Sequence, residues 1–495
     1  MKLYFYIFTL VLIFLGASAC SQNRTINWAF GDSASLNFSQ GFPVPDTNFV
    51  LSSSESCASI SDTSGNLLFY IGSKDLPSGG AWTHQLWNRN HAIMLNGDSI
   101  QGMTSITQGA LIIPFPDSNN LYHVFTISRN QFGNNYLYHS VVDMALDSGL
   151  GGVTIKNHQL NTNGFTVTEK MNAVKHGNGR DWWLVTHQEQ SANYLSYLIS
   201  TSGISGPFVQ STGTYLNYKR TWGQLKFSND GTKMCVVGKT AVCDLFEYDR
   251  CTGFISNWTY LGDTLYETPD EEGYYGCSFS PNNNLLYISS WDSLFQFDLS
   301  AGNILASKTL IYSALCNDTC YIGQHQLASD NKIYIANMSG IGVLSPYFNA
   351  FNTNISFIEN PNIVGIGCNF LYLGTPLGGK RSFFGLPDFP NYELIELSGS
   401  ICDTLTGLLQ NSDLLNLQLK AEPNPTEGNI TIKFPIQQDT GQLKLYNTTG
   451  ELINTFSIAP NIKSVELNVE NLQPGIYFIK AYWKIGLGIC KIIKI

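Results

Sequence analysis

The chain has 495 residues, a formal net charge of −10 and 13% charged residues. This acidic balance excludes a non-specific nucleic-acid-binding protein, because such binding needs a basic face that displaces counterions. The 45 glycines and 13% aromatic residues favour turns and half-buried strands over helices, and the length fits one large β domain plus a small one.

Residues 1–19 predict a signal peptide, with Lys2 as its positive end, an apolar run at 3–15 and a small-residue cleavage site at 17–19. The run is too short to span a bilayer, which takes about 20 residues. Cys20 follows the cleavage site and raises the alternative of bacterial lipoprotein processing, although the usual Leu three positions earlier is Ala17. We therefore expect an exported protein that is either soluble or tethered to the cell surface.

Export permits disulfides, and the chain has 11 cysteines. The spacing favours one local bridge between Cys316 and Cys320 and another between two of Cys235, Cys243 and Cys251, but it does not fix the connectivity. We therefore predict disulfide bonds without assigning every partner.

The odd number of cysteines leaves at least one thiol unpaired, for which Cys20 and Cys490 are the candidates. A zinc site is the alternative use of the pair at 316 and 320. Only His325 lies nearby to extend that pair, whereas a structural zinc site needs four ligands. Structural cysteines are therefore predicted, with no metal and no cofactor.

Short apolar runs separated by Gly, Asn, Asp and Pro repeat from residue 27 onward, without a sustained helical period. Successive copies lie 47 to 61 residues apart, with a mean of 53, a spacing typical of propellers. Six copies are recognised, at residues 66–70, 120–124, 181–185, 232–236, 284–288 and 331–335.

One copy shows the physical basis of the repeat. Leu225 and Phe227 alternate with polar residues, as in a strand with one buried face. Residues 229–231, Asn-Asp-Gly, tolerate the positive φ of a tight hairpin turn, and residues 234–237 form the apolar return strand. Two further strands follow, and four antiparallel strands per unit make a propeller blade.

The repeat predicts an all-β fold with a β-propeller of about seven blades at residues 24–393. Six blades are clear, and the seventh is expected in degenerate form around residues 365–384. A blade cannot bury both faces alone, so the blades must stack into a closed ring. We expect residues 27–30 to supply a strand to the last blade and so close the ring.

Residues 394–420 are predicted to be a linker, and residues 421–495 a second domain. Alternating apolar residues and turn signals in this domain indicate a small β-sandwich. Its expected strands are residues 430–434, 443–446, 464–469 and 475–482.

Four motifs follow one another in this last domain: Pro423-Asn-Pro-Thr-Glu-Gly428, Leu445-Tyr-Asn-Thr-Thr-Gly450, Leu472-Gln-Pro-Gly-Ile-Tyr-Phe-Ile479 and Lys491-Ile-Ile-Lys494. In order and spacing they resemble the type A C-terminal sorting domain of type IX secretion cargo, with Ile495 after the last Lys as a small departure. The motif residues are Pro423, Asn424, Pro425, Gly428, Gly450, Pro474, Gly475, Tyr477, Lys491 and Lys494.

This resemblance implies a Gram-negative source, export through the inner membrane, and the type IX secretion machinery as a partner. It further implies removal of the domain or anchoring at the cell surface, with lipid or lipopolysaccharide at the outer membrane as the anchor. The alternative is an immunoglobulin-like binding module at the C-terminus.

The repeat region resembles the WD-like and YVTN-like propellers of the same secreted proteins. The resemblance rests on the turn at 282–284, on Cys57-Ala-Ser-Ile-Ser-Asp62, on Trp87-Asn-Arg-Asn90 and on Gly385-Leu-Pro-Asp-Phe389. It implies a fold and no reaction.

No catalytic motif is recognised. The run Ser61-Asp-Thr-Ser-Gly65 lacks the spacing of a sialidase Asp box, and the acidic residues 270–272 are better explained as a solvated loop than as a carboxylate pair. His187 and His325 are candidates for the mouth of the channel, as a general base or ligand, or else are strand-end histidines bonded to backbone. Five tryptophans offer either a sugar-stacking surface or core packing, namely Trp82, Trp87, Trp182, Trp183 and Trp222.

Two functions remain open from the sequence. The favoured one is a non-catalytic surface or secreted propeller that binds protein or glycan on its loop face, with no catalytic residue assigned. The alternative is a propeller hydrolase or lyase that acts on polysaccharide or peptide.

Overall fold

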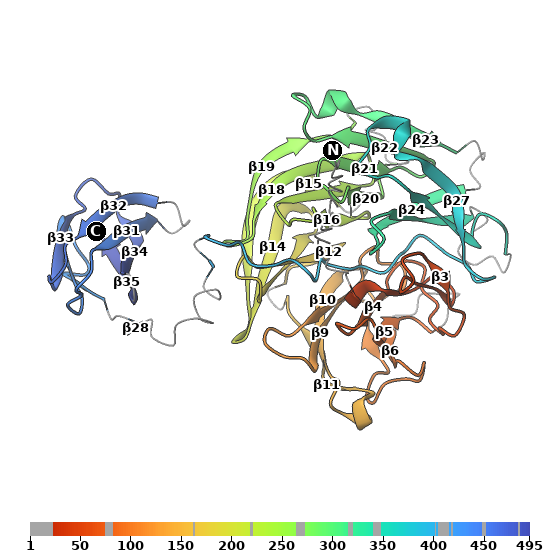
Figure 1. Cartoon of the computed structure of the whole chain (residues 1–495), viewed down its shortest axis with the longest axis horizontal. Helices are drawn as coiled ribbons and strands as arrows, with labels where there is room; N and C mark the ends of the chain where they lie inside the picture. Colours follow the sequence, from red (N-terminus) through yellow and green to blue (C-terminus); the bar gives the residue numbers. More distant parts are fainter. Residues whose placement is uncertain are drawn as a thin grey trace, which may run out of the picture. The chain divides into compact units, whose positions relative to one another are not determined.

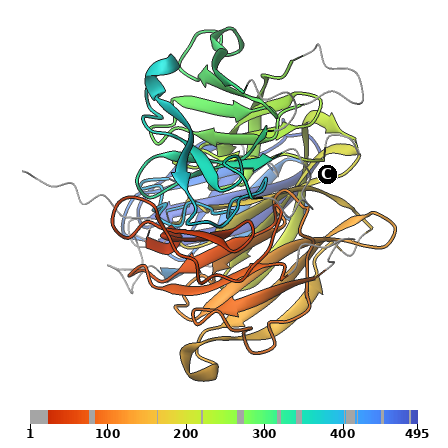
Figure 2. The same ribbon diagram turned by 90° about the vertical axis from the view of Figure 1, so that its right-hand side faces the viewer.

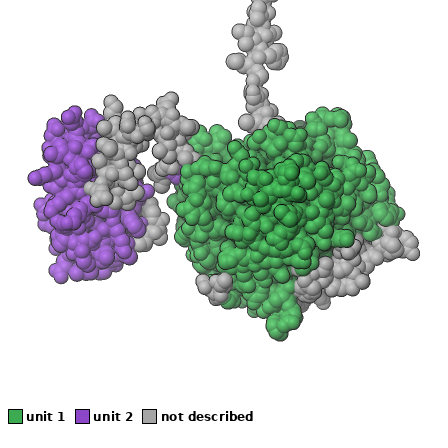
Figure 3. All heavy atoms as spheres, turned by 90° about the horizontal axis from the view of Figure 1, so that it is seen from below, with its two compact units in different colours: residues 1–397 green, residues 398–495 purple. Residues whose placement is uncertain are grey.

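The computed structural model describes all residues except 1–22, 75–82, 162–163, 218–220, 264–272, 315–319, 340–347, 401, 404–414, 417–418, 448–451 and 484–485. The predicted signal peptide, Cys20, Cys316, Trp82, the acidic run at 270–272 and Gly450 lie outside the described residues. The chain divides into two compact units, residues 1–397 and 398–495 (Figure 3).

The described part of unit 1 is all β, with short 3-10 turns and no α-helix. It forms seven antiparallel sheets, six of four strands and one of three, and in each the strands pair in chain order. The three-stranded sheet holds β1 (Asn27–Phe30), β2 (Ala34–Asn37) and β3 (Val44–Pro45). The 3-10 turns are η1 (Asn23–Thr25), η2 (Asp147–Gly149), η3 (Leu305–Ser307) and η4 (Gly365–Cys368).

The next three sheets contain β4 (Ala58–Ser61), β5 (Leu67–Gly72), β6 (Thr83–Asn88) and β7 (Ile100–Gln101); β8 (Ala110–Pro114), β9 (Leu121–Arg129), β10 (Asn135–Asp143) and β11 (Gly152–Gln159); and β12 (Val167–Lys175), β13 (Trp182–Gln188), β14 (Ser191–Ser200) and β15 (Gly203–Leu216). The last three contain β16 (Leu225–Phe227), β17 (Lys233–Gly238), β18 (Val242–Asp249) and β19 (Phe254–Tyr260); β20 (Gly276–Phe279), β21 (Leu285–Ser289), β22 (Ser293–Asp298) and β23 (Thr309–Ser313); and β24 (Cys320–Leu327), β25 (Ile333–Ser339), β26 (Asn354–Ile358) and β27 (Phe370–Pro376).

The sheets surround a common axis, with the first strand of each sheet innermost (Figures 1 and 2). These inner strands contact one another in succession, for example β4 with β8, β12 with β16, and β20 with β24. The inner strands pack against one another because they are apolar and enclosed. In β20 and β21, for example, every residue is buried. The turn between them places Asn283 at a φ of 62°, which Asn tolerates. Unit 1 is therefore a β-propeller, as the repeat predicted.

The ring closes differently from the prediction. β1 pairs with β2 in a sheet of its own, so residues 27–30 do not join the last sheet. That sheet draws its outer strand from β27, so the region around 365–384 is not a degenerate blade. Asp32, which follows β1, contacts Arg381, which lies beyond the end of β27, through a backbone bridge and an ion pair of 2.9 Å with its Nε. The number of seven blades thus depends on taking the three-stranded sheet as a blade.

Residues 382–397 pass through the centre of the ring (Figure 1). At one end the Gly385 amide donates to Ser54 O at 2.9 Å, just before the inner strand β4. Farther on, the Asp388 amide donates to Cys57 O at 3.2 Å, and the Tyr392 hydroxyl donates to Ile112 O in β8 at 2.7 Å.

The end of this axial segment leaves the ring on the side of β13 and β18. Arg250 donates to Ile395 O at 2.6 Å, and the Leu397 amide donates to Gly177 O at 2.7 Å. Residues 394–397, expected in the linker, therefore pack on unit 1. Because the segment touches several inner strands along its length, the axis is filled by the chain itself.

The described part of unit 2 contains two β-sheets around a core of its own. The larger sheet has the order β28-β35-β34-β31-β32 and the smaller one the order β29-β30-β33. The four strands expected from the sequence correspond to β30, β31, β33 and β34. The strands are β28 (Leu415–Asn416), β29 (Lys420–Glu422), β30 (Asn429–Lys433), β31 (Gly441–Asn447), β32 (Leu452–Ile458), β33 (Ser464–Asn468), β34 (Gly475–Trp483) and β35 (Gly486–Lys494).

The cysteines correct one predicted pairing. Cys235 and Cys243 are free thiols with their sulfur atoms 4.0 Å apart, while Cys251 is disulfide-bonded. The local bridge fails because Cys235 faces Leu245 across the hairpin and so stands diagonal to Cys243. In the part of the chain that the structure describes, no helix is long and apolar enough to cross a membrane.

Candidate functional site

Polar side chains from several sheets converge at the end of the ring where the inner strands begin. Glu55 precedes β4, Thr107 precedes β8, Glu169 lies near the start of β12, and Tyr275 immediately precedes β20. Because the inner strands surround the axis and run in the same direction, their first residues meet at one mouth of the ring. We call Glu55, Thr107, Glu169 and Tyr275 the axial cluster.

Glu169 is the fixed member of the axial cluster. Its Oε1 accepts a hydrogen bond of 2.9 Å from Nη2 of Arg129, which forms an ion pair with it. Its Oε2 accepts from both the amide and the hydroxyl of Thr107, each at 3.1 Å. With 2% of its side chain exposed, Glu169 is therefore committed to protein partners on both oxygens.

Glu55 is the accessible carboxyl of the axial cluster, since its side chain is only partly buried. Burial raises its pKa well above the ordinary value, and the charge of Glu169 raises it further. The pKa of Glu169 is also raised by burial, against the lowering effect of Arg129. With Glu169 paired to Arg129, Glu55 is the carboxyl of the two that takes up a proton more readily, and in that form it can donate a hydrogen bond.

Tyr275 adds a free hydroxyl to the axial cluster. Its side chain is 7% exposed, and its oxygen is buried without a hydrogen-bond partner. Burial and the neighbouring Glu55 raise its pKa well above the ordinary value, so the hydroxyl stays protonated. Beside Glu55, this hydroxyl is a second hydrogen-bonding group at the mouth.

Lys170 supports the loop beside the axial cluster. Its side chain is fully buried, and its Nζ donates to three successive carbonyl oxygens, of Thr221 at 3.1 Å, Trp222 at 2.5 Å and Gly223 at 3.0 Å. Burial lowers the pKa of Lys170 to about 7, against the raising effect of Glu169. This lysine fixes the loop that places Trp222, 40% exposed, at the surface.

Aromatic rings border the axial cluster on its other side. Phe384 of the axial segment lies 5.4 Å from Tyr275 and 5.3 Å from Trp291, measured between ring centroids. Tyr321 lies 4.8 Å from Trp291 in an edge-to-face arrangement. Trp291 and Tyr321 remain partly exposed, so the mouth presents both polar groups and aromatic surface.

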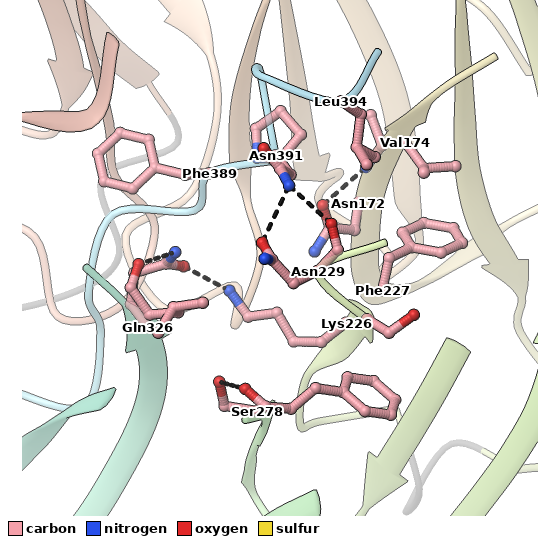
Figure 4. Close-up of a pocket in the computed structure, with 15 residues that line it drawn as sticks. Asn172, Val174, Lys226, Phe227, Asn229, Ser278, Gln326, Phe389, Asn391 and Leu394 are labelled. Carbon is pink, nitrogen blue, oxygen red and sulfur yellow. Dashed lines mark hydrogen bonds between the residues drawn. The ribbon is translucent and has the colours of Figure 1, made fainter. Parts of the chain in front are cut away.

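The opposite end of the axis holds a small polar cavity of about 60 Å³ (Figure 4). Lys226 enters it from β16 and donates to Oε1 of Gln326 at 2.7 Å, while Asn391 of the axial segment donates to Asn229 at 2.9 Å. Deeper in the ring, Lys226 lies 3.5 Å from a carboxylate oxygen of Asp388. These groups pin the axial segment to β16 and β24.

Asp388 gives the axial segment a pH dependence. Burial raises its pKa to about 6, against the lowering effect of Lys226 and Gln108, whereas an unfolded Asp titrates near about 3.9. The folded state therefore binds the proton more tightly than the unfolded state does. The contribution of Asp388 to the free energy of unfolding falls as the pH rises from 4 through 6. A shift of about 2 pKa units corresponds to about 3 kcal/mol.

We expect the free energy of unfolding of the wild type, minus that of Asp388→Asn, to fall by about 3 kcal/mol between pH 4 and pH 7. Denaturant titrations of both proteins at several pH values measure this difference. A difference that is flat with pH, or that rises, would contradict the raised pKa.

The histidines proposed for the channel mouth are buried within the sheets. His187 is fully buried with its ring edge-to-face against Tyr194, at 4.7 Å, and burial lowers its pKa to about 3. His325 is also fully buried, its backbone bonds to the side chain of Gln224, and burial lowers its pKa to about 3. Both rings are therefore neutral and closed to a ligand from outside.

The tryptophans divide between core and surface. Trp87, Trp182 and Trp183 are buried at 2–5% exposure, in agreement with core packing, whereas Trp222 is exposed near the axial cluster. In the described part of the chain, no group of three or more His, Cys, Asp or Glu side chains is placed to hold a metal ion.

The axial cluster was not among the residues predicted from the sequence, but the sequence holds a signal for it. Gln108, Gln224 and Gln324 recur at or just before inner strands, and each uses its amide to bind the backbone of another segment at the axis. For example, Gln108 accepts from the Leu225 amide at 2.6 Å and donates to its carbonyl at 3.1 Å. Aligning the copies on this glutamine would have placed Thr107 at the mouth.

In unit 2 the first motif clamps the last strand. The Asn424 side chain donates to Lys491 O and accepts from the Ile493 amide, both at 2.8 Å. The Thr426 amide donates to Ile493 O at 2.9 Å, and the Ile495 amide returns a bond to Thr426 O at 3.1 Å. The motif at 423–428 and the motif at 491–494 thus form one structural element.

The other motif residues serve the same small fold. Tyr477 is buried to 8% exposure and its hydroxyl donates to Gln473 O at 2.8 Å, across the turn that holds Pro474 and Gly475. Gly428 donates to the Thr426 hydroxyl at 3.3 Å and accepts from the Val469 amide at 2.9 Å.

Comparison with known proteins gives different results for the two units: a family model matches only residues in unit 2, whereas the similar solved structures include β-propellers. No curated protein is similar to the chain at a significant level. Among solved structures, the chain is similar to a protein from Lactobacillus plantarum, at 14% identity and a TM-score of 0.45, over 73% of this chain and 97% of that one.

It is also similar to the periplasmic gluconolactonase of Pseudomonas aeruginosa, at 11% identity and a TM-score of 0.34, over 78% and 94% of the two chains. The β-propeller domain of Cps50 from Myceliophteria thermophila is 10% identical, with a TM-score of 0.38, over 64% and 94%.

Residues 421–494 match the family model described as the secretion system C-terminal sorting domain. The match covers the motif at 423–428 and the last strand that it clamps. The C-terminal part of this chain is therefore a type IX secretion sorting domain, carried by a β-propeller.

Proposed function

We propose that this protein is a non-catalytic binding propeller, delivered to the cell surface or beyond by its sorting domain, and that it binds a glycan or protein at the axial cluster. The predicted signal peptide at 1–19 would supply the first export step, and the sorting domain directs the second. The observation that carries the binding role is the convergence of Glu55, Thr107, Glu169 and Tyr275 at one mouth of the ring.

The chemistry of this mouth suits a polyhydroxylated ligand such as a saccharide. Glu55 in its protonated form and the unpartnered Tyr275 hydroxyl can each donate and accept hydrogen bonds. Trp222 and Trp291 supply ring faces at the same mouth, on which the apolar face of a sugar or an aromatic side chain packs. A few polar groups beside aromatic surface are the usual composition of a ligand site.

A hydrolase is the second candidate, because two carboxyl groups with raised pKa values lie together at this mouth. Glycoside hydrolysis needs both carboxyl groups directed at the substrate, one as acid and one as base or nucleophile. Glu169 has both oxygens bound by Arg129 and Thr107, which leaves Glu55 alone to act. This arrangement favours binding over catalysis.

The exported protein, purified from the culture medium and applied to a glycan and protein array, tests the proposal. We expect Glu55→Ala to weaken binding of the selected ligand by about tenfold, the loss of one hydrogen bond of about 1.4 kcal/mol. Glu55→Gln should retain binding, because its amide also donates and accepts. Glu470→Ala, an exposed change in the sorting domain, serves as the matched control.

Absence of any array ligand sensitive to Glu55 or Trp222 would contradict the assignment of the site. Cleavage of an array glycan that is abolished by both Glu55→Ala and Glu55→Gln would instead identify the protein as a hydrolase, because Gln cannot transfer a proton.

A further inference from the structure

One sheet face of the sorting domain carries charge of a single sign. The strands β31, β32, β34 and β35 contain no aspartate or glutamate, although the whole chain has a net charge of −10. They contain four lysines: Lys444, Lys480, Lys491 and Lys494. The smaller sheet of the same unit, in contrast, mixes both signs and pairs Lys433 with Glu422.

The alternation of burial shows which side chains face outward. In β34, Tyr477, Ile479, Ala481 and Trp483 are buried, whereas Ile476 and Phe478 are 39% and 38% exposed. Lys480 lies on the outward face with them. Across the ladders, Lys444 stands directly opposite Lys480 and Lys491 directly opposite Phe478, so all three lysines share this face.

The pairing of Lys444 with Lys480 is unfavourable for the fold. Like charges directly opposite one another on neighbouring strands destabilise a sheet. Among the described residues, neither lysine has a carboxylate within ion-pair distance. The cross-strand pair of like charges itself therefore adds no stability to the sheet, which points to a role outside the domain.

Both lysines are held in place by aromatic rings. Nζ of Lys444 lies 5.4 Å from the ring centroid of Tyr482, and Nζ of Lys480 lies 5.5 Å from that of Tyr446. Cation–π contacts of this length orient the ammonium groups without neutralising them. The face therefore presents fixed positive charges beside exposed apolar side chains.

We propose that this outward face of β31, β32, β34 and β35 is the surface by which the sorting domain docks on an acidic protein of the type IX secretion machinery. The inference deepens the export step of the proposed function. Charge complementarity selects an acidic partner, and fixed lysines beside Ile476 and Phe478 match a folded protein surface, whose carboxylates also have fixed positions.

Reversal of one charge tests the surface in intact type IX-secreting cells. Lys444→Glu in the full chain places a carboxylate opposite Lys480, which should leave the melting temperature unchanged or raise it. We expect the exported fraction to fall at least fivefold and the chain to accumulate in the periplasm. Lys463→Glu, an exposed change beside the smaller sheet, is the matched control and should export normally, as should Lys444→Arg.

Normal export of Lys444→Glu would overturn the proposal. So would a loss of export that accompanies a lower melting temperature, since unfolding would then explain it. Binding of the purified wild type to vesicles that contain phosphatidylglycerol, lost in Lys444→Glu, would overturn it in favour of a lipid surface. Ligand binding can also be measured on the Lys444→Glu protein recovered from the periplasm. This measurement tests the binding site of the propeller independently of export, so failure of the docking surface and failure of the proposed binding function give different results.

Discussion

Gly385→Ala is expected to lower the free energy of unfolding by about 3 kcal/mol or more. A Cβ at this position would lie 2.2 Å from the carbonyl oxygen of Glu55 and 2.3 Å from its Cα. Backbone atoms cannot swing aside as a flexible side chain can, so either the axial segment or the entrance to β4 must move. Overpacking of a filled core typically costs about 1–3 kcal/mol, and this contact is at the severe end.

Gly302→Ala is the matched control, because a Cβ there meets no atom within 4 Å and the backbone requires no positive φ. Guanidinium titration followed by tryptophan fluorescence measures both variants. Gly302→Ala should remain within about 0.5 kcal/mol of the wild type. If Gly385→Ala behaved like this control, residues 382–397 would not lie against Glu55 in solution.

The position of Gly385 shows what the sequence could not predict. The repeat at 284–288 and its neighbours predicts strands because alternation and turn chemistry are local properties. The passage of residues 382–397 along the axis is not local, since it depends on the space that a ring of sheets leaves at its centre. The segment Gly385-Leu-Pro-Asp-Phe389 resembles a recurrent piece of related propellers, but its sequence does not indicate where it lies in the fold.

The contrast between local patterns and contacts that need the closed ring also explains which functional residues could be predicted. The sorting motifs could be predicted because 423–428 and 491–494 are defined by their order along the chain, and the structure then joins them through Asn424. Glu55, Thr107 and Glu169 come from three different sheets, and no spacing brings them together until the ring has closed. His187 and His325 were chosen by residue type at strand ends, but the fully buried sheet packing removes both from solvent.

That Cys235 and Cys243 stay free while Cys251 is disulfide-bonded could not be predicted for a related reason. Spacing favours partners close in sequence, whereas hairpin register decides which side chains meet. Ring closure follows the same logic: the residues that complete the last sheet, β27, lie next to it in sequence, while β1 to β3 contribute a sheet of their own.

Lys170→Met is expected to lower the free energy of unfolding by about 4 kcal/mol. The substitution preserves most of the side-chain volume but removes the donor shared by Thr221 O, Trp222 O and Gly223 O. Thr221 O keeps the Glu169 amide as a donor at 3.3 Å, whereas Trp222 O and Gly223 O lose theirs, at about 1–3 kcal/mol for each buried carbonyl. Lys156→Met removes a surface ion pair with Asp98 and an exposed hydrogen bond to Asn96, so it should change stability by less than about 1 kcal/mol and serves as the control.

The same substitution should also affect the candidate site before the protein unfolds. The three carbonyls belong to the loop that displays Trp222, so loss of Lys170 releases this loop while the inner strands remain paired. We therefore expect ligand binding to weaken at denaturant-free conditions, with the far-ultraviolet spectrum of the propeller retained. Full stability together with full binding in Lys170→Met would contradict both roles. Reduced stability with unchanged binding would restrict Lys170 to the fold and place the ligand away from Trp222.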